Sequence, residues 1–258
     1  MELNLGGKVA IVTGGSRGIG RAIAVSLTAE GARVAICSRD PKTLEVTVNA
    51  LRASGADVIG EVADVSRAGD LERLVDVTLE RWGGVDILVN NAGGPPPGHF
   101  DELTDHDWQQ AIDLSLMSSV RALRAALPYL KKSGSGRVVN ILSTSVKESV
   151  EGMLLSNSLR TAAAGLAKTM SRELGPFGIT VNNVCPAHVM TARLREVAAF
   201  RAKEGKLDVR ASTEAIALRR MASPAEVADL VTFLVSARAA YITGTSVAID
   251  GGSTNSLM

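Results

Sequence analysis

The chain has 258 residues, a formal net charge of +1 at pH 7 and only 3% aromatic residues. A nearly balanced charge and few rings for base stacking argue against a nucleic-acid-binding protein. No apolar run approaches the roughly 18 residues of a membrane-spanning helix, and the N-terminus lacks a signal-peptide pattern, so we expect a cytoplasmic protein outside the membrane. The two cysteines, Cys37 and Cys185, suggest neither a disulfide framework nor a metal site, and we expect both to be buried.

Short runs rich in β-branched residues alternate along the chain with amphipathic segments of helical length. We predict strands at residues 8–12, 33–37, 57–62, 86–90, 137–142, 179–184 and 246–249, and helices at residues 18–30, 41–54, 67–82, 104–131, 152–174 and 224–236. Such βα units build an α/β fold: a single doubly wound parallel sheet of the Rossmann type, with about seven strands and helices on both faces. No linker or repeat divides residues 1–258, which we expect to form one domain.

Residues 187–223 interrupt this alternation, and a segment of that length after a strand usually forms a lid or binding segment over the ligand crevice. Between residues 191 and 221, basic residues outnumber acidic ones by eight to four. A local positive charge over a cleft attracts an anionic substrate, although a solvated amphipathic lid explains the same mixture equally well.

A glycine-rich turn, TGGSRGIG at residues 13–20, connects the first predicted strand to the first predicted helix. Gly14, Gly18 and Gly20 allow the backbone to turn sharply and to approach a pyrophosphate closely. The unpaired N–H groups and the positive dipole end of the helix then meet the phosphate charge. The turn and its context therefore predict a dinucleotide cofactor.

The end of the second predicted strand indicates which dinucleotide is bound. A fold that prefers NAD places an acidic residue there for the ribose hydroxyls, but this chain has Ser38 and Arg39. A small residue followed by a guanidinium suits a 2′-phosphate, and Arg17 in the glycine-rich turn adds a second positive charge. We therefore favour NADP over NAD; in the alternative, Arg39 is a solvated charge and Asp40 binds the ribose.

Five motifs, in order, resemble the short-chain dehydrogenase/reductase family between about residues 6 and 253. They are the TGGSRGIG turn, the pair Asp64-Val65, the segment Asn90-Asn91-Ala92-Gly93, the segment VNNVCPAHVMT at 181–191, and Ile249-Asp250-Gly251-Gly252. The fourth of these motifs, at 181–191, has Ala187 where the family usually has glycine. The resemblance implies cofactor contacts at Gly14, Ser16, Arg17, Gly18, Ile19, Gly20, Ser38, Arg39, Asp64, Val65, Asn91, Ala92, Gly93, Arg160, Pro186, Val189 and Thr191.

The catalytic positions that the resemblance implies depart from the family pattern. Ser143, after the fifth predicted strand, matches the family's serine. The family's YxxxK pair is replaced by Ser156 and Arg160, and Ser115 stands where an asparagine is usual. Three of the four expected catalytic positions are therefore changed.

These changes affect proton transfer most. Tyrosine has a pKa of about 10 that a neighbouring cation lowers, whereas a serine hydroxyl is a far weaker acid, and a guanidinium does not release a proton in a protein. Lys147 is a candidate proton donor or an exposed loop charge. We expect His99 and His188 to have surface or packing roles, and no tyrosine stands where a displaced catalytic phenol is expected.

The sequence therefore predicts an NADP-dependent oxidoreductase that reduces a small-molecule carbonyl compound or oxidises an alcohol, and that resembles the 3-oxoacyl reductase branch of the family. Ser143, Ser156, Arg160 and Lys147 are the candidate catalytic residues. The alternative is a catalytically silent NADP(H)-binding sensor or scaffold protein. The alanine-rich helix at 159–167 resembles the family's interface helix and favours a homodimer or homotetramer.

Overall fold

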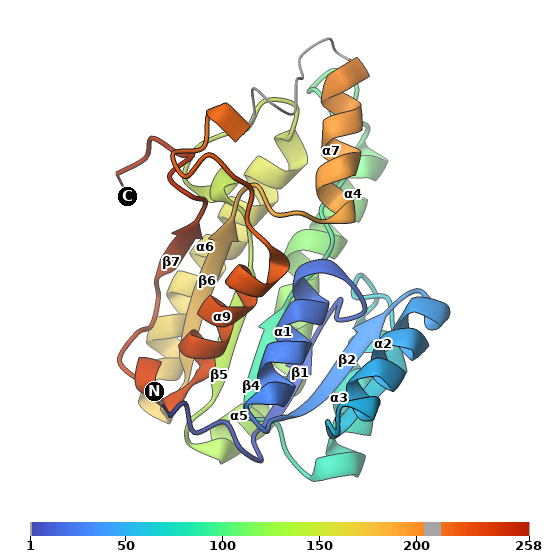
Figure 1. Ribbon diagram of the computed structural model, residues 1–258, viewed down its shortest axis with the longest axis vertical. Helices are drawn as coiled ribbons and strands as arrows, with labels where there is room; N and C mark the ends of the chain where they lie inside the picture. Colours follow the sequence, from blue (N-terminus) through green and yellow to red (C-terminus); the bar gives the residue numbers. More distant parts are fainter. Residues whose placement is uncertain (1, 204–212, 258) are drawn as a thin grey trace.

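The computed structural model describes residues 2–203 and 213–257, and its centre is one parallel sheet (Figure 1). The strands of this part of the chain lie in the order β3-β2-β1-β4-β5-β6-β7. Their bounds are Val9–Val12 (β1), Arg33–Ser38 (β2), Val58–Val62 (β3), Ile87–Asn90 (β4), Arg137–Ile141 (β5), Thr180–Pro186 (β6) and Ser246–Ile249 (β7). The winding direction reverses between β1 and β4, which opens a crevice at the carboxyl ends of these strands. The predicted fold class and strand positions are confirmed.

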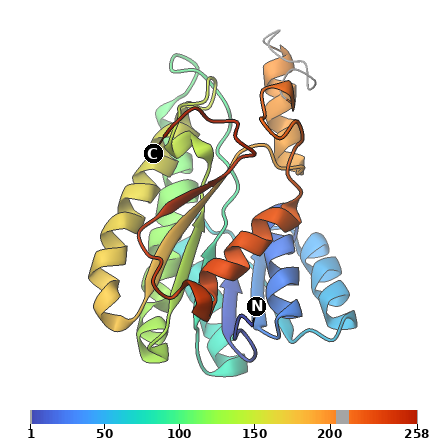
Figure 2. The same cartoon turned by 60° about the vertical axis from the view of Figure 1, so that its left-hand side comes forward.

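Helices cover both faces of the sheet (Figure 2). The helices are α1 (Gly18–Ala29), α2 (Pro41–Ala53), α3 (Ala68–Trp82), α4 (Asp105–Ile112), α5 (Ser118–Ser133), α6 (Leu154–Leu174), α7 (Ala192–Lys203) and α9 (Pro224–Val235). One hydrophobic core forms between the sheet and the apolar sides of α1, α2 and α9, and a second forms between the sheet and α3, α5 and α6. The apolar faces of these six helices are therefore buried against the sheet, which the alternating sequence pattern predicts.

The segment predicted as one helix at 104–131 is divided, and this part of the prediction is wrong. A π-helical turn, Asp113–Met117, separates α4 from α5. Arg121 holds this turn through an ion pair of 2.8 Å with Asp113 and a hydrogen bond to the carbonyl of Ser66. The wider turn packs against α6 and buries Ser115, so tertiary contacts override the regular helical period here.

The excursion at 187–223 contains α7, which stands above the carboxyl ends of the strands in Figure 1. Residues 204–212 of this excursion lie outside the described residues. Cys37 and Cys185 are buried and unbridged, as predicted. In the described residues, no helix has the length and apolar character needed to cross a membrane.

Candidate active site

The glycine-rich turn connects β1 to α1 in a conformation that depends on the absence of side chains. Gly14 has a φ of 59°, and a Cβ on Gly20 would lie 2.5 Å from Asn91 Nδ2 and still closer to the Gly14 carbonyl oxygen. The N-terminus of α1 has no side-chain cap and no acidic residue in its first turn. Its first N–H groups are therefore available to an anion that approaches the turn.

Asn91, immediately after β4, fixes the glycine-rich turn from the neighbouring strand. Its Nδ2 atom donates to the carbonyl oxygens of Thr13 and Gly14, each at 3.1 Å. Its backbone N–H donates to the Thr13 hydroxyl at 2.8 Å. Thr13 was missed as a site residue, although it begins the motif, because its role depends on a strand that lies far away in sequence.

A small cavity of about 190 Å³ lies at the end of β2 and is lined by Arg17, Ser38, Arg39, Asp40 and Thr43. Ser16 donates to the Ser38 hydroxyl at 2.9 Å. The Asp40 carboxylate caps α2 by accepting the Lys42 N–H at 3.0 Å, so ribose binding by Asp40 would compete with this cap. Two guanidinium groups at such a cavity suit a phosphate group.

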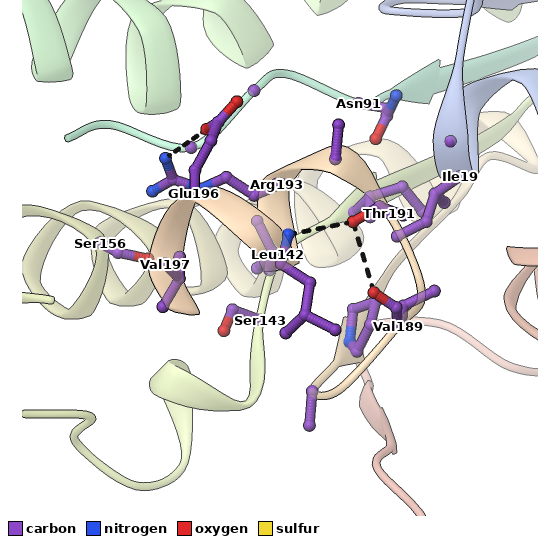
Figure 3. Close-up of a pocket in the computed structure, with 18 of the residues that line it drawn as sticks. Ile19, Asn91, Leu142, Ser143, Ser156, Val189, Thr191, Arg193, Glu196 and Val197 are labelled. Atoms are coloured by element: carbon purple, nitrogen blue, oxygen red, sulfur yellow. Dashed lines mark hydrogen bonds and ion pairs between the residues drawn. The ribbon is translucent and has the colours of Figure 1, made fainter. Parts of the chain in front are cut away.

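A larger cavity of about 1540 Å³ continues from the glycine-rich turn across the carboxyl ends of the strands to α7 (Figure 3). This volume exceeds the usual 300–1,000 Å³ of a small-molecule site, so a dinucleotide and a second molecule fit together. The predicted residues that line it are Gly14, Ser16, Arg17, Gly18, Ile19, Ser38, Arg39, Val65, Asn91, Ala92, Gly93, Ser143, Ser156, Arg160, Pro186, Val189 and Thr191.

Three predicted site residues are not part of this lining. Gly20 is buried behind the turn, where its lack of a side chain permits close packing. Asp64 accepts hydrogen bonds from the N–H and hydroxyl of Ser66, at 3.0 and 2.8 Å, and so stabilises the turn before α3. Lys147 is half-buried after β5 but does not line the pocket.

Two serine hydroxyls occupy the part of the pocket where the family's catalytic serine and tyrosine are expected. Ser143 Oγ accepts the Ser145 N–H at 3.1 Å, which leaves the hydroxyl hydrogen available to a ligand. Ser156 lies in the first turn of α6 and is only 4% exposed. Within the described residues its hydroxyl has no hydrogen-bond partner. Figure 3 shows both serines at the pocket wall.

Arg160 lies one turn beyond Ser156 on α6. Its Nη1 donates to the carbonyl oxygens of Ile141 and Leu142, at 2.9 and 3.0 Å, so the other N–H groups of the guanidinium remain available. No carboxylate in the described part of the chain pairs with it. Burial, assisted by the charge of Arg193, lowers the pKa of Arg160 to about 10, which leaves it charged at neutral pH.

The remaining candidates have different positions. Ser115 is buried in the π-helical turn, and its hydroxyl finds no partner among the described residues. His188 lines the pocket, whereas the His99 ring lies 6.1 Å from the ring of Phe200. Neither Tyr129 nor Tyr241 lines the pocket. Within the described residues, no cluster of three or more His, Cys, Asp or Glu side chains is suited to a metal ion.

Residues missed by the sequence analysis include Arg193, whose guanidinium reaches from α7 to the loop after β4. Its partners on that loop are a glycine and a backbone carbonyl, which leave no signal in the sequence. The doubly wound sheet, the glycine cradle and the serines beside an arginine together define a nucleotide-dependent reductase.

The comparisons with known proteins agree with this class. Residues 14–254 match the family described as enoyl-(acyl carrier protein) reductase. Dehydrogenase/reductase SDR family member 4 of Oryctolagus cuniculus is 36% identical over 98% of this chain and 96% of its own length. The chain belongs to the short-chain dehydrogenase/reductase family.

Solved structures of the family cover the whole fold. The complex of L-sorbose reductase from Gluconobacter frateurii with NADPH and L-sorbose has a TM-score of 0.93 and 30% identity, and covers 100% of both chains. An NADPH-bound short-chain oxidoreductase from Pseudomonas aeruginosa PAO1, described as containing an atypical catalytic center, has a TM-score of 0.87 and 31% identity, over 96% of this chain and 97% of its own.

Proposed function

We propose that this protein is an NADP-dependent reductase of a small-molecule carbonyl compound, which also oxidises the corresponding alcohol. The observation that carries the proposal is one continuous pocket: the glycine cradle and the Arg17–Arg39 cavity lie at one end, and Ser143, Ser156 and Arg160 lie at the other. Residues at the first end would hold the phosphates of a dinucleotide, and those at the other end would hold its nicotinamide ribose and a carbonyl substrate. The NADPH-bound relatives support the choice of cofactor.

The residues of the pocket fit NADP along its length. The uncapped N-terminus of α1 and the glycine-rich turn suit the pyrophosphate. Arg39, with Arg17 and Ser38, suits the 2′-phosphate. The uncommitted N–H groups of Arg160 suit the hydroxyls of the nicotinamide ribose.

In the proposed reaction, Ser143 and Ser156 bind the substrate carbonyl oxygen. The bound cofactor supplies a hydride to the carbonyl carbon. Ser143 is oriented to donate by the Ser145 N–H that its oxygen accepts, and Ser156 donates from a buried position. Donors held in place stabilise the negative charge that develops on oxygen, and holding the reactants together removes much of the barrier.

The proton that completes the reduction comes from water in this proposal. Neither serine hydroxyl is acidic enough, and Arg160 does not release a proton. Lys147, the other candidate donor, does not line the pocket. The loss of a tuned phenol removes general-acid assistance of about 10²- to 10⁴-fold, so we expect slow turnover.

Consumption of NADPH with a panel of aldehydes, ketones and 3-oxoacyl thioesters tests the reductase proposal. The comparison variant carries Ser156→Tyr and Arg160→Lys together, and we expect it to be faster than the wild type. If the wild type binds NADPH but consumes none with any carbonyl, the reductase proposal fails. The changed positions Ser115, Ser156 and Arg160 favour a catalytically silent NADP(H)-binding sensor or scaffold in that case.

Titration with NADPH and NADH tests the cofactor. Arg39→Ala should weaken NADPH binding about 10- to 100-fold, because a hydrogen bond from a charged donor to the phosphate contributes about 1.5–3 kcal/mol. NADH binding should change little, since NADH lacks that phosphate. Tighter binding of NADH than of NADPH by the wild type would overturn the cofactor assignment.

The proposal also includes the organisation of the protein: the chain forms a single domain, and its copies assemble as a homodimer or homotetramer.

A further inference from the structure

The first turn of α7 is attached to the loop between β4 and α4 by one arginine. Arg193 Nη2 donates to the carbonyl oxygen of Pro95, and Nη1 forms an ion pair of 3.2 Å with Glu196 on the same helix. The guanidinium lies directly against Gly94: a Cβ there would be 2.9 Å from Arg193 Nε and Nη2. We refer to Arg193, Gly94 and Pro95 as the clasp.

The other end of the described part of α7 contacts a second loop. The Phe200 ring lies near His99 and against Gly152, where a Cβ would be 2.8 Å from a ring carbon. Gly152 belongs to the loop between β5 and α6 that precedes Ser156, and its carbonyl oxygen accepts the Gly98 N–H at 2.9 Å. The helix therefore lies across two loops that border the pocket.

The clasp determines where the apolar side chains of α7 lie. Leu194 and Val197 line the same pocket as Ser143 and Ser156. Figure 3 shows Val197 on the side of α7 near Ser143 and Ser156, and the Arg193–Glu196 ion pair on the side toward the loop after β4. A substrate whose carbonyl is held by the serines therefore meets this apolar wall. Release of the clasp would remove this attachment, leave the first turn with the bond from the Leu194 N–H to the Thr191 hydroxyl at 3.4 Å, and allow the wall to move.

We propose that Arg193 is a positioning residue for the carbonyl substrate, because its clasp on Gly94 and Pro95 holds Leu194 and Val197 in contact with the bound substrate. This proposal rests on the proposed reductase function. It assigns Arg193 no contact with the reacting atoms. Substrate affinity should therefore depend on the clasp, whereas the affinity for NADPH should not.

A double-mutant cycle between the two sides of the clasp tests the proposal. Arg193→Ala removes the donor, and Gly94→Ala displaces only the flexible end of Arg193, because that guanidinium is what the new methyl group would meet. Each change should raise KM for the carbonyl substrate about tenfold, because that factor corresponds to the loss of one hydrogen bond from a charged donor. The values of kcat and of the Kd for NADPH should stay within about twofold of the wild type. The double variant should be no worse than Arg193→Ala alone.

Arg195→Ala is the matched control, since Arg195 is an exposed arginine that lines the same pocket from the same helix but has no ion pair or hydrogen bond in the described residues. Its KM should stay within about twofold of the wild type. A KM raised equally by Arg195→Ala would show that the overall charge of α7 attracts the substrate and would overturn the proposal. Additive effects of the Gly94 and Arg193 changes would also overturn it.

Hydrogen exchange of the α7 amides, measured without substrate, separates the clasp from the reductase function. Arg193→Ala and Gly94→Ala should each speed exchange at residues 192–200 about tenfold relative to the wild type, whether or not any carbonyl is reduced. Unchanged exchange in both variants means that the clasp does not hold α7. Faster exchange together with an inactive wild type would instead reject the reductase function and keep the clasp.

Discussion

Replacement of Gly20 by alanine should damage both folding and cofactor binding. A methyl group there would be 2.5 Å from Asn91 Nδ2 and closer to the Gly14 carbonyl, so α1 must move by about 1 Å to reach an ordinary contact distance of ~3.5 Å. Overpacking of this kind costs about 1–3 kcal/mol, and each of the two Asn91 side-chain bonds to the turn contributes about 1 kcal/mol. Alanine regains about 0.5–1 kcal/mol as a better helix former. We therefore expect a net loss of about 2–4.5 kcal/mol in the free energy of unfolding.

Urea unfolding and NADPH titration of Gly20→Ala provide the assay. Gly69→Ala is the matched control, because Gly69 also lies in a first helical turn but has nothing within 4 Å of its Cβ position. The control should be unchanged or stabilised by up to about 1 kcal/mol, whereas Gly20→Ala should also bind NADPH at least tenfold more weakly. Wild-type stability and NADPH affinity in Gly20→Ala would refute the packing argument.

Three further predictions concern stability and assembly. Burial raises the pKa of Asp86, but hydrogen bonds from groups including Ser133 outweigh it and hold that pKa below the usual range. The ionised carboxylate therefore stabilises the fold at neutral pH, and this stabilisation is lost as the pH falls below about 3.9. Asp86→Asn should therefore cost about 1–3 kcal/mol at pH 7, and urea titrations should show this deficit shrinking in acid. A hydrogen bond from Arg220 lowers the pKa of Glu226 to about 2, so thermal melts should show that Glu226→Gln lowers Tm in full above about pH 4.5, with the deficit shrinking as the pH falls toward 2. Gly165→Glu, at an exposed position of α6, should dissociate the proposed homo-oligomer in sedimentation velocity, and unchanged assembly would exclude this face.

Local chemistry made the strands and the cofactor end of the pocket predictable. The inner strands β1, β4, β5 and β6 are buried along their whole length, so their apolar runs mark their positions, and the glycine-rich turn joins elements adjacent in sequence. Ser38 ends β2 and Arg39 follows it, so their place at the small cavity needs only the fold class and the motif. These predictions depend on interactions within one βα unit and its neighbour.

Contacts between distant segments explain what the sequence did not predict. The π-helical turn depends on Arg121 reaching Asp113 and the carbonyl of Ser66, and the clasp joins Arg193 to a carbonyl 98 residues earlier. Backbone carbonyls and glycines leave no pattern in a single sequence. The same holds for Lys147, since only the path of the chain after β5 decides whether its side chain lines the pocket.

The pH dependence of turnover follows from the identity of the groups in the pocket. Between about pH 7.5 and 9, neither serine ionises and Arg160, with its pKa of about 10, stays charged. Burial raises the pKa of Cys185 to about 11, so that thiol also remains unchanged. With water as the proton source, kcat/KM for the carbonyl substrate should therefore not change with pH across this range. In the variant with Ser156→Tyr and Arg160→Lys, kcat/KM should change with pH because the new phenol titrates. A limb already present in the wild type would mean that a protein group delivers the proton, and the assignment to water would be wrong.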